Sequence, residues 1–169
     1  MSLRLLKFFA VVLLIAAGMS LFSNENLQVS ASENVYVVDG DSLEIDGKRI
    51  RLLGIDSPEY KQFCYNEKHQ KYDCGIMAKD YLEKLIHSQK VDCKEESVDM
   101  YKRSLSVCYV GETNLNEEMV KAGWALAYRD EGEKYETLEK QAKANKLGVW
   151  QGRFMRPELY RFLVKRKNS

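Results

Sequence analysis

Three short apolar runs follow one another between residues 35 and 55, and tight turns separate them. The turns lie at residues 39–41 (Asp-Gly-Asp) and 46–47 (Asp-Gly), and Asp-Gly is a strong hairpin signal. Apolar and polar residues alternate through the first two runs, with Val35, Val37, Leu43 and Ile45 as the apolar positions. Because this alternation is typical of strands with one buried face, the stretch predicts a three-stranded meander that ends with a strand over residues 49–55.

The remainder of the chain predicts two more strands and three helices. Apolar residues at helical spacing indicate helices over 75–88, from the N-cap Asn114 to Gly123, and over about 134–147. Strands are expected at 91–94 and 104–110, with a charged hairpin at 95–103 between them. Five short strands with helices at the ends suit a mainly β α+β fold, a small closed barrel. An all-antiparallel α+β sandwich fits the pattern almost as well.

The N-terminal segment has the layout of a secretory signal peptide. Arg4 and Lys7 precede an uncharged run over residues 8–22, and small residues follow at 29–31. That run is shorter than the roughly 20 residues needed to cross a bilayer as a helix. We expect cleavage after Ala31, which leaves a single domain over residues 32–169 in the periplasm or outside the cell. An uncleaved N-terminal anchor is the alternative.

Four cysteines follow this segment, at Cys64, Cys74, Cys93 and Cys108. An even number in an exported chain indicates a disulfide framework. Three pairings are possible. We favour Cys64–Cys74, which closes a short loop, and Cys93–Cys108, which ties two neighbouring strands. The lack of a Cys-x-x-Cys spacing argues against a zinc site or a thioredoxin-like redox site.

Net charge gives no support to a nucleic-acid function. Residues 1–31 carry Arg4, Lys7 and Glu25, so without them the 26 basic and 25 acidic residues fall to 24 of each. Dedicated nucleic-acid-binding domains are often clearly basic. The functional argument therefore depends on local clusters of charged residues.

Two acidic clusters lie at the ends of predicted strands. Asp39 and Asp41 flank the first turn, and Asp56 and Glu59 follow the third strand. A meander would bring the clusters together, and carboxylates that repel one another favour a hard divalent cation such as calcium or magnesium. Each cluster taken alone is an ordinary turn or loop.

Two arginines complete the charged set. Arg51 precedes Asp56 by five residues, an odd separation that places the two on opposite faces of a regular strand. A bulge near Gly54 would be needed to bring them to one site. Arg103 ends the charged hairpin. Phosphodiester cleavage uses such groups, because guanidinium groups and a metal offset charge on phosphorus while a carboxylate activates water.

Several segments, in this order along the chain, resemble the staphylococcal (micrococcal) nuclease family. They are residues 37–43 (VVDGDSL), 49–59 (RIRLLGIDSPE), 99–105 (DMYKRSL), 116–125 (NEEMVKAGWA) and 147–150 (LGVW). Together they cover about residues 35–152. The resemblance implies a thermonuclease-like domain, a five-stranded OB-fold barrel with three helices.

The resemblance also implies a metal site. Asp41 and Asp56 match side-chain calcium ligands of the family, and Ser57 matches a residue that offers its backbone carbonyl. The family usually has threonine at that position, but the side chain is not the ligand. Asp39 matches an outer acid that acts through water.

The other matches imply catalytic and substrate-binding roles. Glu59 corresponds to the general base, and Arg51 and Arg103 correspond to two phosphate-binding arginines. Tyr101 corresponds to a residue that lines the nucleotide pocket. Tyr128 is a second such residue, at a point where the match slips by one position.

The implied activity is that of a calcium-dependent endonuclease. Water attacks phosphorus, the 5′-oxygen leaves, and a 3′-phosphate remains on DNA or RNA, with low sequence specificity because base contacts are not central. No protein partner is implied, a monomer is expected, and the membrane is involved only if the N-terminal segment stays uncleaved. The alternatives are a non-catalytic OB-fold module that binds nucleic acid or protein, and a tethered surface protein. Retention of all the acids and arginines favours the enzyme.

One loop departs from the family pattern, and the C-terminal tail is open to two interpretations. The loop with Cys64 and Cys74 is longer than in the plain pattern. The tail beyond residue 152 is basic, and we interpret it either as a source of phosphate attraction or as a solvated terminus. Its basic residues are Arg153, Arg156, Arg161, Lys165, Arg166 and Lys167.

Overall fold

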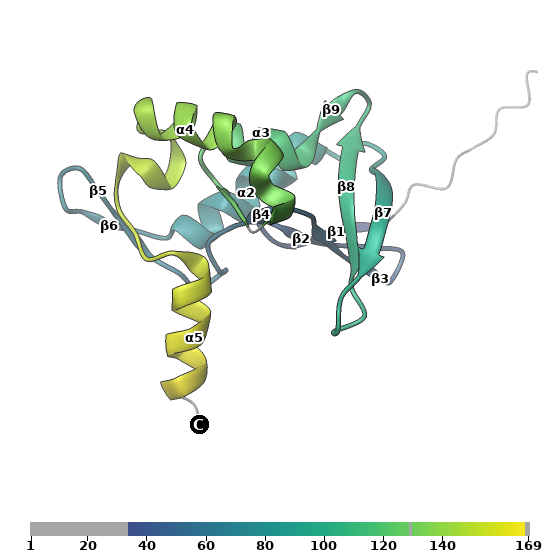
Figure 1. The fold of residues 1–169 in the computed structure, drawn as a ribbon, viewed down its shortest axis with the longest axis horizontal. Helices are drawn as coiled ribbons and strands as arrows, with labels where there is room; N and C mark the ends of the chain where they lie inside the picture. The colour runs from purple at the N-terminus through teal and green to yellow at the C-terminus, as the bar shows by residue number, and fades with distance from the viewer. Residues whose placement is uncertain (1–33, 129, 168–169) are drawn as a thin grey trace, which may run out of the picture. The chain divides into compact units, whose positions relative to one another are not determined.

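The predicted meander forms one side of a curled sheet in the computed structural model (Figure 1). Its strands pair antiparallel, and the third pairs in parallel with a strand from the second half of the chain. That parallel pair excludes the all-antiparallel sandwich, so the mainly β, OB-fold prediction is confirmed as a curled half-barrel. The sheet order is β1 (Val35–Asp39), β2 (Ser42–Ile45), β3 (Lys48–Leu52), β8 (Ser104–Val110) and β7 (Asp92–Val98), with β9 (Thr113–Asn114) paired to β8.

The structure describes residues 34–128 and 130–167, which all fall within the unit Ser32–Ser169. The predicted signal segment, residues 1–31, lies outside the described residues. Within the described part of the chain, no helix has the length and apolar character needed to cross a membrane.

Helices pack on the sheet and on one another. The three predicted helices are present as α2 (Cys74–Ile86), α3 (Leu115–Lys121) and α4 (Glu136–Ala144). The last is shorter than predicted at both ends, because residues 134–135 belong to the 3-10 helix η1 (Asp130–Tyr135) and α4 ends at Ala144. A fourth helix, α5 (Pro157–Lys167), forms in the basic tail, where none was predicted, and Figure 1 shows it on the opposite side of the domain from α4. Proline is favoured at a first helical position because its missing N–H needs no partner there.

A capped helix and a buried amide join the helical layer to the sheet. Asn114 caps α3 as predicted, since its Oδ1 accepts the Glu117 N–H at 3.3 Å. Asn116 is fully buried. Its Nδ2 donates to the carbonyls of Leu53 at 3.0 Å and Ser106 at 3.2 Å, and its Oδ1 accepts the Cys108 N–H at 3.1 Å. These bonds fix the backbone just after β3.

The chain breaks after β3 where a bulged strand was predicted. The strand ends at Leu52, and Gly54 has a φ of +76°, a left-handed conformation that glycine adopts without strain. A Cβ at Gly54 would also lie 2.4 Å from the Glu131 carbonyl oxygen. The next residues form β4 (Ile55–Asp56), which pairs with β10 (Leu126–Ala127). This turn replaces the predicted bulge. It changes the direction of the chain before Asp56, so that Arg51 and Asp56 can reach the same site.

Both favoured disulfides are present. Cys64–Cys74 ties β5 (Cys64–Asn66) to the start of α2, and Cys93–Cys108 joins directly opposed residues of β7 and β8. The loop with Cys64 and Cys74 contains two short strands. These are β5 and β6 (Lys71–Tyr72), which form a small sheet with β11 (Gly152–Arg153); the 3-10 helix η2 (Gly148–Gln151) precedes that last strand.

Reduction of the disulfides is expected to lower the thermal stability of the domain. Each bond restricts the unfolded chain, and loss of a native disulfide from a small domain typically costs about 2–5 kcal/mol. Melting curves with and without dithiothreitol would measure the effect. The double variant Cys64→Ala/Cys74→Ala separates the two bonds, because dithiothreitol should lower its melting temperature further through Cys93–Cys108 alone. Equal melting temperatures for reduced and oxidised wild-type protein would contradict the prediction.

Candidate active site

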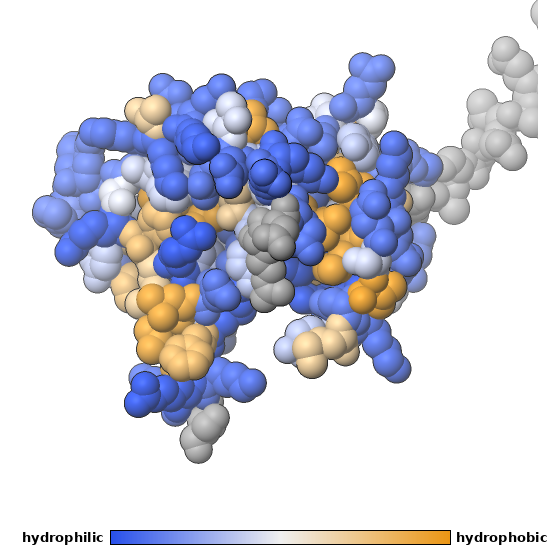
Figure 2. Space-filling view, in the orientation of Figure 1, coloured by the Kyte–Doolittle hydropathy of each residue, from blue (hydrophilic) through white to orange (hydrophobic). Residues whose placement is uncertain are grey.

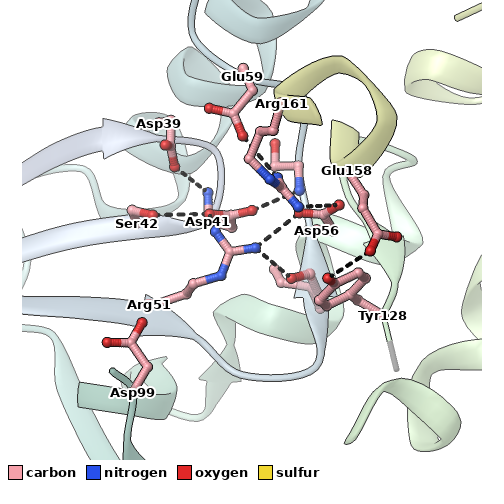
Figure 3. A network of polar contacts seen from close by, with 12 residues as sticks. Asp39, Asp41, Ser42, Arg51, Asp56, Glu59, Asp99, Tyr128, Glu158 and Arg161 are labelled. Carbon is pink, nitrogen blue, oxygen red and sulfur yellow. Dashed lines mark hydrogen bonds and ion pairs between the residues drawn. The ribbon is translucent and has the colours of Figure 1, made fainter. Parts of the chain in front are cut away.

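The two predicted acidic clusters meet at the side chain of Arg51. The guanidinium lies between two carboxylates, with Nη1 2.6 Å from Asp41 Oδ1 and Nη2 2.9 Å from Asp56 Oδ1 (Figure 3). Asp41 is in the β1–β2 turn, Arg51 is in β3, and Asp56 is in β4. The meander and the break at Gly54 therefore bring together residues from three segments, as the sequence predicted.

Asp41 is a buried carboxylate that the backbone holds in place. It is 2% exposed, and it accepts the Ser57 N–H at 2.7 Å and the Ser42 hydroxyl at 2.9 Å. Burial raises the pKa of Asp41 to about 6, and the charge of Asp39 adds to this, although Arg51 and both hydrogen bonds oppose it. A carboxylate in this environment favours a nearby cation.

Burial alone would lower the pKa of Arg51. The charges of Asp41 and Asp56 outweigh that effect, so the pKa of Arg51 is raised above its ordinary value. The guanidinium therefore stays charged and can bind an anionic phosphate.

Asp39 and Ser57 border the buried pair. Asp39 Oδ1 accepts the Asp41 N–H at 3.1 Å. The Ser57 hydroxyl donates to the Trp124 carbonyl at 3.0 Å, which leaves the predicted ligand role to the Ser57 backbone carbonyl. The β1–β2 turn lies so close to Ser57 that a Cβ at Gly40 would be 2.1 Å from Ser57 Oγ. This position therefore requires glycine.

A cleft of 690 Å³ opens beside these residues. Tyr101 and Arg103 of the β7–β8 hairpin line this cleft together with Glu59 and Tyr128. Figure 2 shows a hollow between the hairpin tip and α5. The site residues that line the cleft are Asp39, Arg51, Glu59, Tyr101, Arg103, Tyr128 and Arg161.

Arg103 is anchored by its own hairpin. Its Nε donates to Asp99 Oδ2 at 2.8 Å, and Asp99 Oδ1 accepts the backbone N–H of Tyr101 and of Arg103. Burial would raise the pKa of Asp99, but these hydrogen bonds and the Arg103 charge lower it. Among the contacts of the described residues, none joins Arg103 to Asp41, Asp56 or Glu59. The structure thus places Arg103 on the cleft wall, paired with Asp99.

Arg161 is the site residue that sequence reasoning missed. From α5 its Nη1 donates to Asp56 Oδ1 and to Glu59 Oε1, each at 2.8 Å, and its Nη2 donates to Asp56 Oδ2 at 3.2 Å (Figure 3). Burial lowers the pKa of Arg161, but the hydrogen bonds and charges of both acids raise it overall.

The sequence carried a signal for the helix that presents Arg161. Pro157 suits a first helical position, and Leu159, Phe162 and Leu163 recur at helical spacing. The sequence of the tail does not indicate where the helix packs, because its position depends on residues about 100 positions earlier in the chain.

A hard divalent cation fits the donor chemistry of this site. The donors that converge, Asp41 and Asp56, are buried carboxylates, and the Ser57 backbone follows directly. An all-oxygen set favours calcium or magnesium over zinc. No three His, Cys, Asp or Glu side chains among residues 34–128 and 130–167 are arranged to hold an ion. Backbone oxygen and water would therefore have to complete the shell, as is common for calcium.

Comparison with known proteins gives the family. Residues 49–152 match the family described as staphylococcal nuclease homologue. The chain is 35% identical to the micrococcal nuclease of Shigella flexneri over 136 residues. The aligned region covers 70% of this chain and 72% of that protein. The chain is 32% identical over 136 residues to the thermonuclease of Staphylococcus hyicus, with 72% and 78% covered.

A third relative has a different name. The succinoglycan biosynthesis protein ExoI of Rhizobium meliloti (strain 1021) is 31% identical over 118 residues, which are 68% of this chain but 61% of that protein. The chain therefore spans less than two thirds of that relative. Since the family match covers more than half of the chain and includes Arg51, Asp56, Glu59 and Arg103, the chain belongs to the staphylococcal nuclease family.

Proposed function

We propose that this chain is an exported, calcium-dependent endonuclease that hydrolyses phosphodiester bonds of DNA and RNA and leaves 3′-phosphates. The observation that carries the proposal is the meeting of Asp41 and Asp56 at Arg51, with Glu59 beside them at a cleft that also holds Arg103. The names of the relatives, micrococcal nuclease and thermonuclease, support the same activity.

The proposed metal site consists of oxygen ligands. Asp41, Asp56 and the Ser57 backbone carbonyl would hold the ion, and Asp39 would act through water. Bound calcium would supply positive charge that offsets the charge developing on the phosphate. The hydrogen bonds from Ser42 and Ser57 orient Asp41 for this role.

The chain's own groups account for the hydrolysis step. Glu59 removes a proton from the attacking water as the new oxygen–phosphorus bond forms. The bond from phosphorus to the 5′-oxygen breaks, and that oxygen takes a proton from solvent water and leaves as a hydroxyl. Arg51 and Arg103 stabilise the charge on the phosphorane oxygens, and guanidinium suits this because it forms paired hydrogen bonds to phosphate.

Two tyrosines support low sequence specificity. Tyr101 is 63% exposed on the hairpin, and Tyr128 lines the other side of the cleft. Aromatic rings that stack on bases accept every base, because each base presents a π-face. We therefore expect substrate choice to depend on how easily a strand enters the cleft.

Export is proposed from the signal-like residues 1–31 ahead of the domain 32–169. The two disulfides support it, since such bonds persist in oxidising compartments. N-terminal sequencing of the protein recovered from its native envelope or medium tests the proposal. A mature chain that begins near Ser32 supports cleavage, and an intact N-terminus would indicate an anchor.

Digestion of single-stranded DNA by purified residues 32–169 is the direct test of activity. Cleavage is expected with calcium and should stop when EGTA is added, with 3′-phosphate ends on the products. No cleavage by a folded, oxidised protein would instead favour a nucleic-acid or protein binding module.

The variant Glu59→Gln is expected to slow cleavage by about 10²- to 10⁴-fold, because a general base typically contributes that much. Calcium binding, measured by calorimetry, should persist. Glu131→Gln is the matched control, because Glu131 is exposed in the same cleft and has no proposed role. An unchanged rate for Glu59→Gln would remove its assignment as the base.

The variant Arg103→Ala is expected to reduce kcat by about 10²- to 10³-fold, the usual effect of losing one group that stabilises transition-state charge. Its melting temperature should change little, since a partly exposed ion pair such as Arg103–Asp99 contributes about 0–1 kcal/mol. Arg49→Ala removes another cleft arginine and should leave kcat nearly unchanged. Equal rates for the two variants would contradict a specific role for Arg103.

A further inference from the structure

The helix α5 is attached to the domain mainly through polar contacts. Pro157 is its buried residue, and its apolar side chains remain exposed. Figure 2 shows them as an orange surface over the helix, formed by Leu159, Phe162, Leu163 and Val164. Little apolar surface of α5 is therefore buried, and such elements open more easily than the core.

Polar contacts hold α5 in place, and in one of them the Tyr128 hydroxyl donates to Glu158 Oε1 at 3.4 Å. At its entry, Gln62 Nε2 donates to the Met155 carbonyl at 2.7 Å, and one turn into the helix the Tyr160 hydroxyl donates to the Lys61 carbonyl at 3.2 Å. The shortest contact from the middle of the helix is that of Arg161, at 2.8 Å from both Asp56 and Glu59. Arg161 thus links the middle of α5 directly to two of the proposed site residues.

Arg161 contacts the atoms that the proposed reaction requires. Its guanidinium binds both carboxylate oxygens of Asp56, the proposed metal ligand, and one oxygen of Glu59, the proposed base. Asp56 Oδ1 also accepts from Arg51, so two cations already neutralise Asp56. A divalent ion at Asp56 would be repelled by both guanidinium groups at short range.

The two arginines differ in how readily they can move. The Arg51 side chain is 14% exposed and originates in the sheet, whereas the Arg161 side chain is 35% exposed and originates in the loosely attached α5. Displacement of Arg161 therefore disturbs little packing, and its charge is solvated again when it leaves.

We propose that Arg161 sets the calcium affinity of the site by competing with the ion for Asp56. The ion loads when it displaces Arg161, and this frees Glu59 to act as the base. The inference depends on the proposed calcium-dependent function and assigns to α5 a role in the metal loading of that site.

The test is calorimetric titration of calcium into the full domain, residues 32–169, without nucleic acid. Arg161→Gln is expected to lower the calcium Kd by about tenfold, the change that one charge-assisted hydrogen-bonded pair typically corresponds to. Arg161→Lys keeps the charge but loses the two-pronged contact, so its Kd should lie between the two. Arg166→Gln is the matched control, because it removes the same charge from an exposed position of the same helix and should leave the Kd close to that of wild type.

The outcomes separate this inference from the proposed function. Tighter calcium binding by Arg161→Gln, or binding by that variant when wild type binds too weakly to measure, supports the competition. If wild type binds calcium and Arg161→Gln binds it equally or more weakly, the competition is wrong while the calcium-dependent nuclease stands. Loss of cleavage with an unchanged Kd would likewise overturn it and make Arg161 a substrate-binding residue. If neither protein binds calcium, the calcium assignment fails and this inference fails with it.

Discussion

The arrangement of the site depends on the burial of Asp41 beside Arg51. A carboxylate taken out of water must be paired and hydrogen-bonded, and Asp41 obtains its partners from β3 and from the Ser57 backbone. Removal of one member of such a buried pair typically costs about 3–5 kcal/mol, because the other charge is left without a partner. The same contacts that satisfy Asp41 therefore hold the β1–β2 turn against the segment that follows β4, where Glu59 lines the cleft.

The sequence predicted the parts of the molecule that local patterns determine. Turn residues and alternation marked the meander, and an N-cap marked the start of α3 at Asn114. The disulfide Cys93–Cys108 followed from strands that are neighbours in sequence. The two acidic clusters could be placed together because a meander leaves them few other positions. Their chemical roles came from the resemblance to a family, and they stay predictions.

The parts that escaped prediction depend on contacts between distant residues. The alternation of side chains showed that the strand had to change direction between Arg51 and Asp56. A β-bulge and a break in the strand leave the same sequence pattern. The packing of Gly54 against Glu131 selects the break. The helix in the tail was missed although Pro157 and the apolar spacing indicated it. The placement of Arg161 could not be predicted, since it results from polar contacts that leave no periodic pattern.

One buried side chain joins Glu59 to the segment that leads into α5. Gln62 is 1% exposed; its Oε1 accepts the Glu59 N–H at 3.3 Å, and its Nε2 binds the Met155 carbonyl ahead of α5. The Gln62 carbonyl accepts the Gly75 N–H at 3.1 Å, so Gln62 is attached to the loop that Cys64–Cys74 closes covalently. The conformational entropy of this loop is lost largely when the bond forms. Glu59, which lines the cleft, is therefore attached to a loop that the disulfide has already ordered, and little of the binding free energy of a polynucleotide is needed to order it.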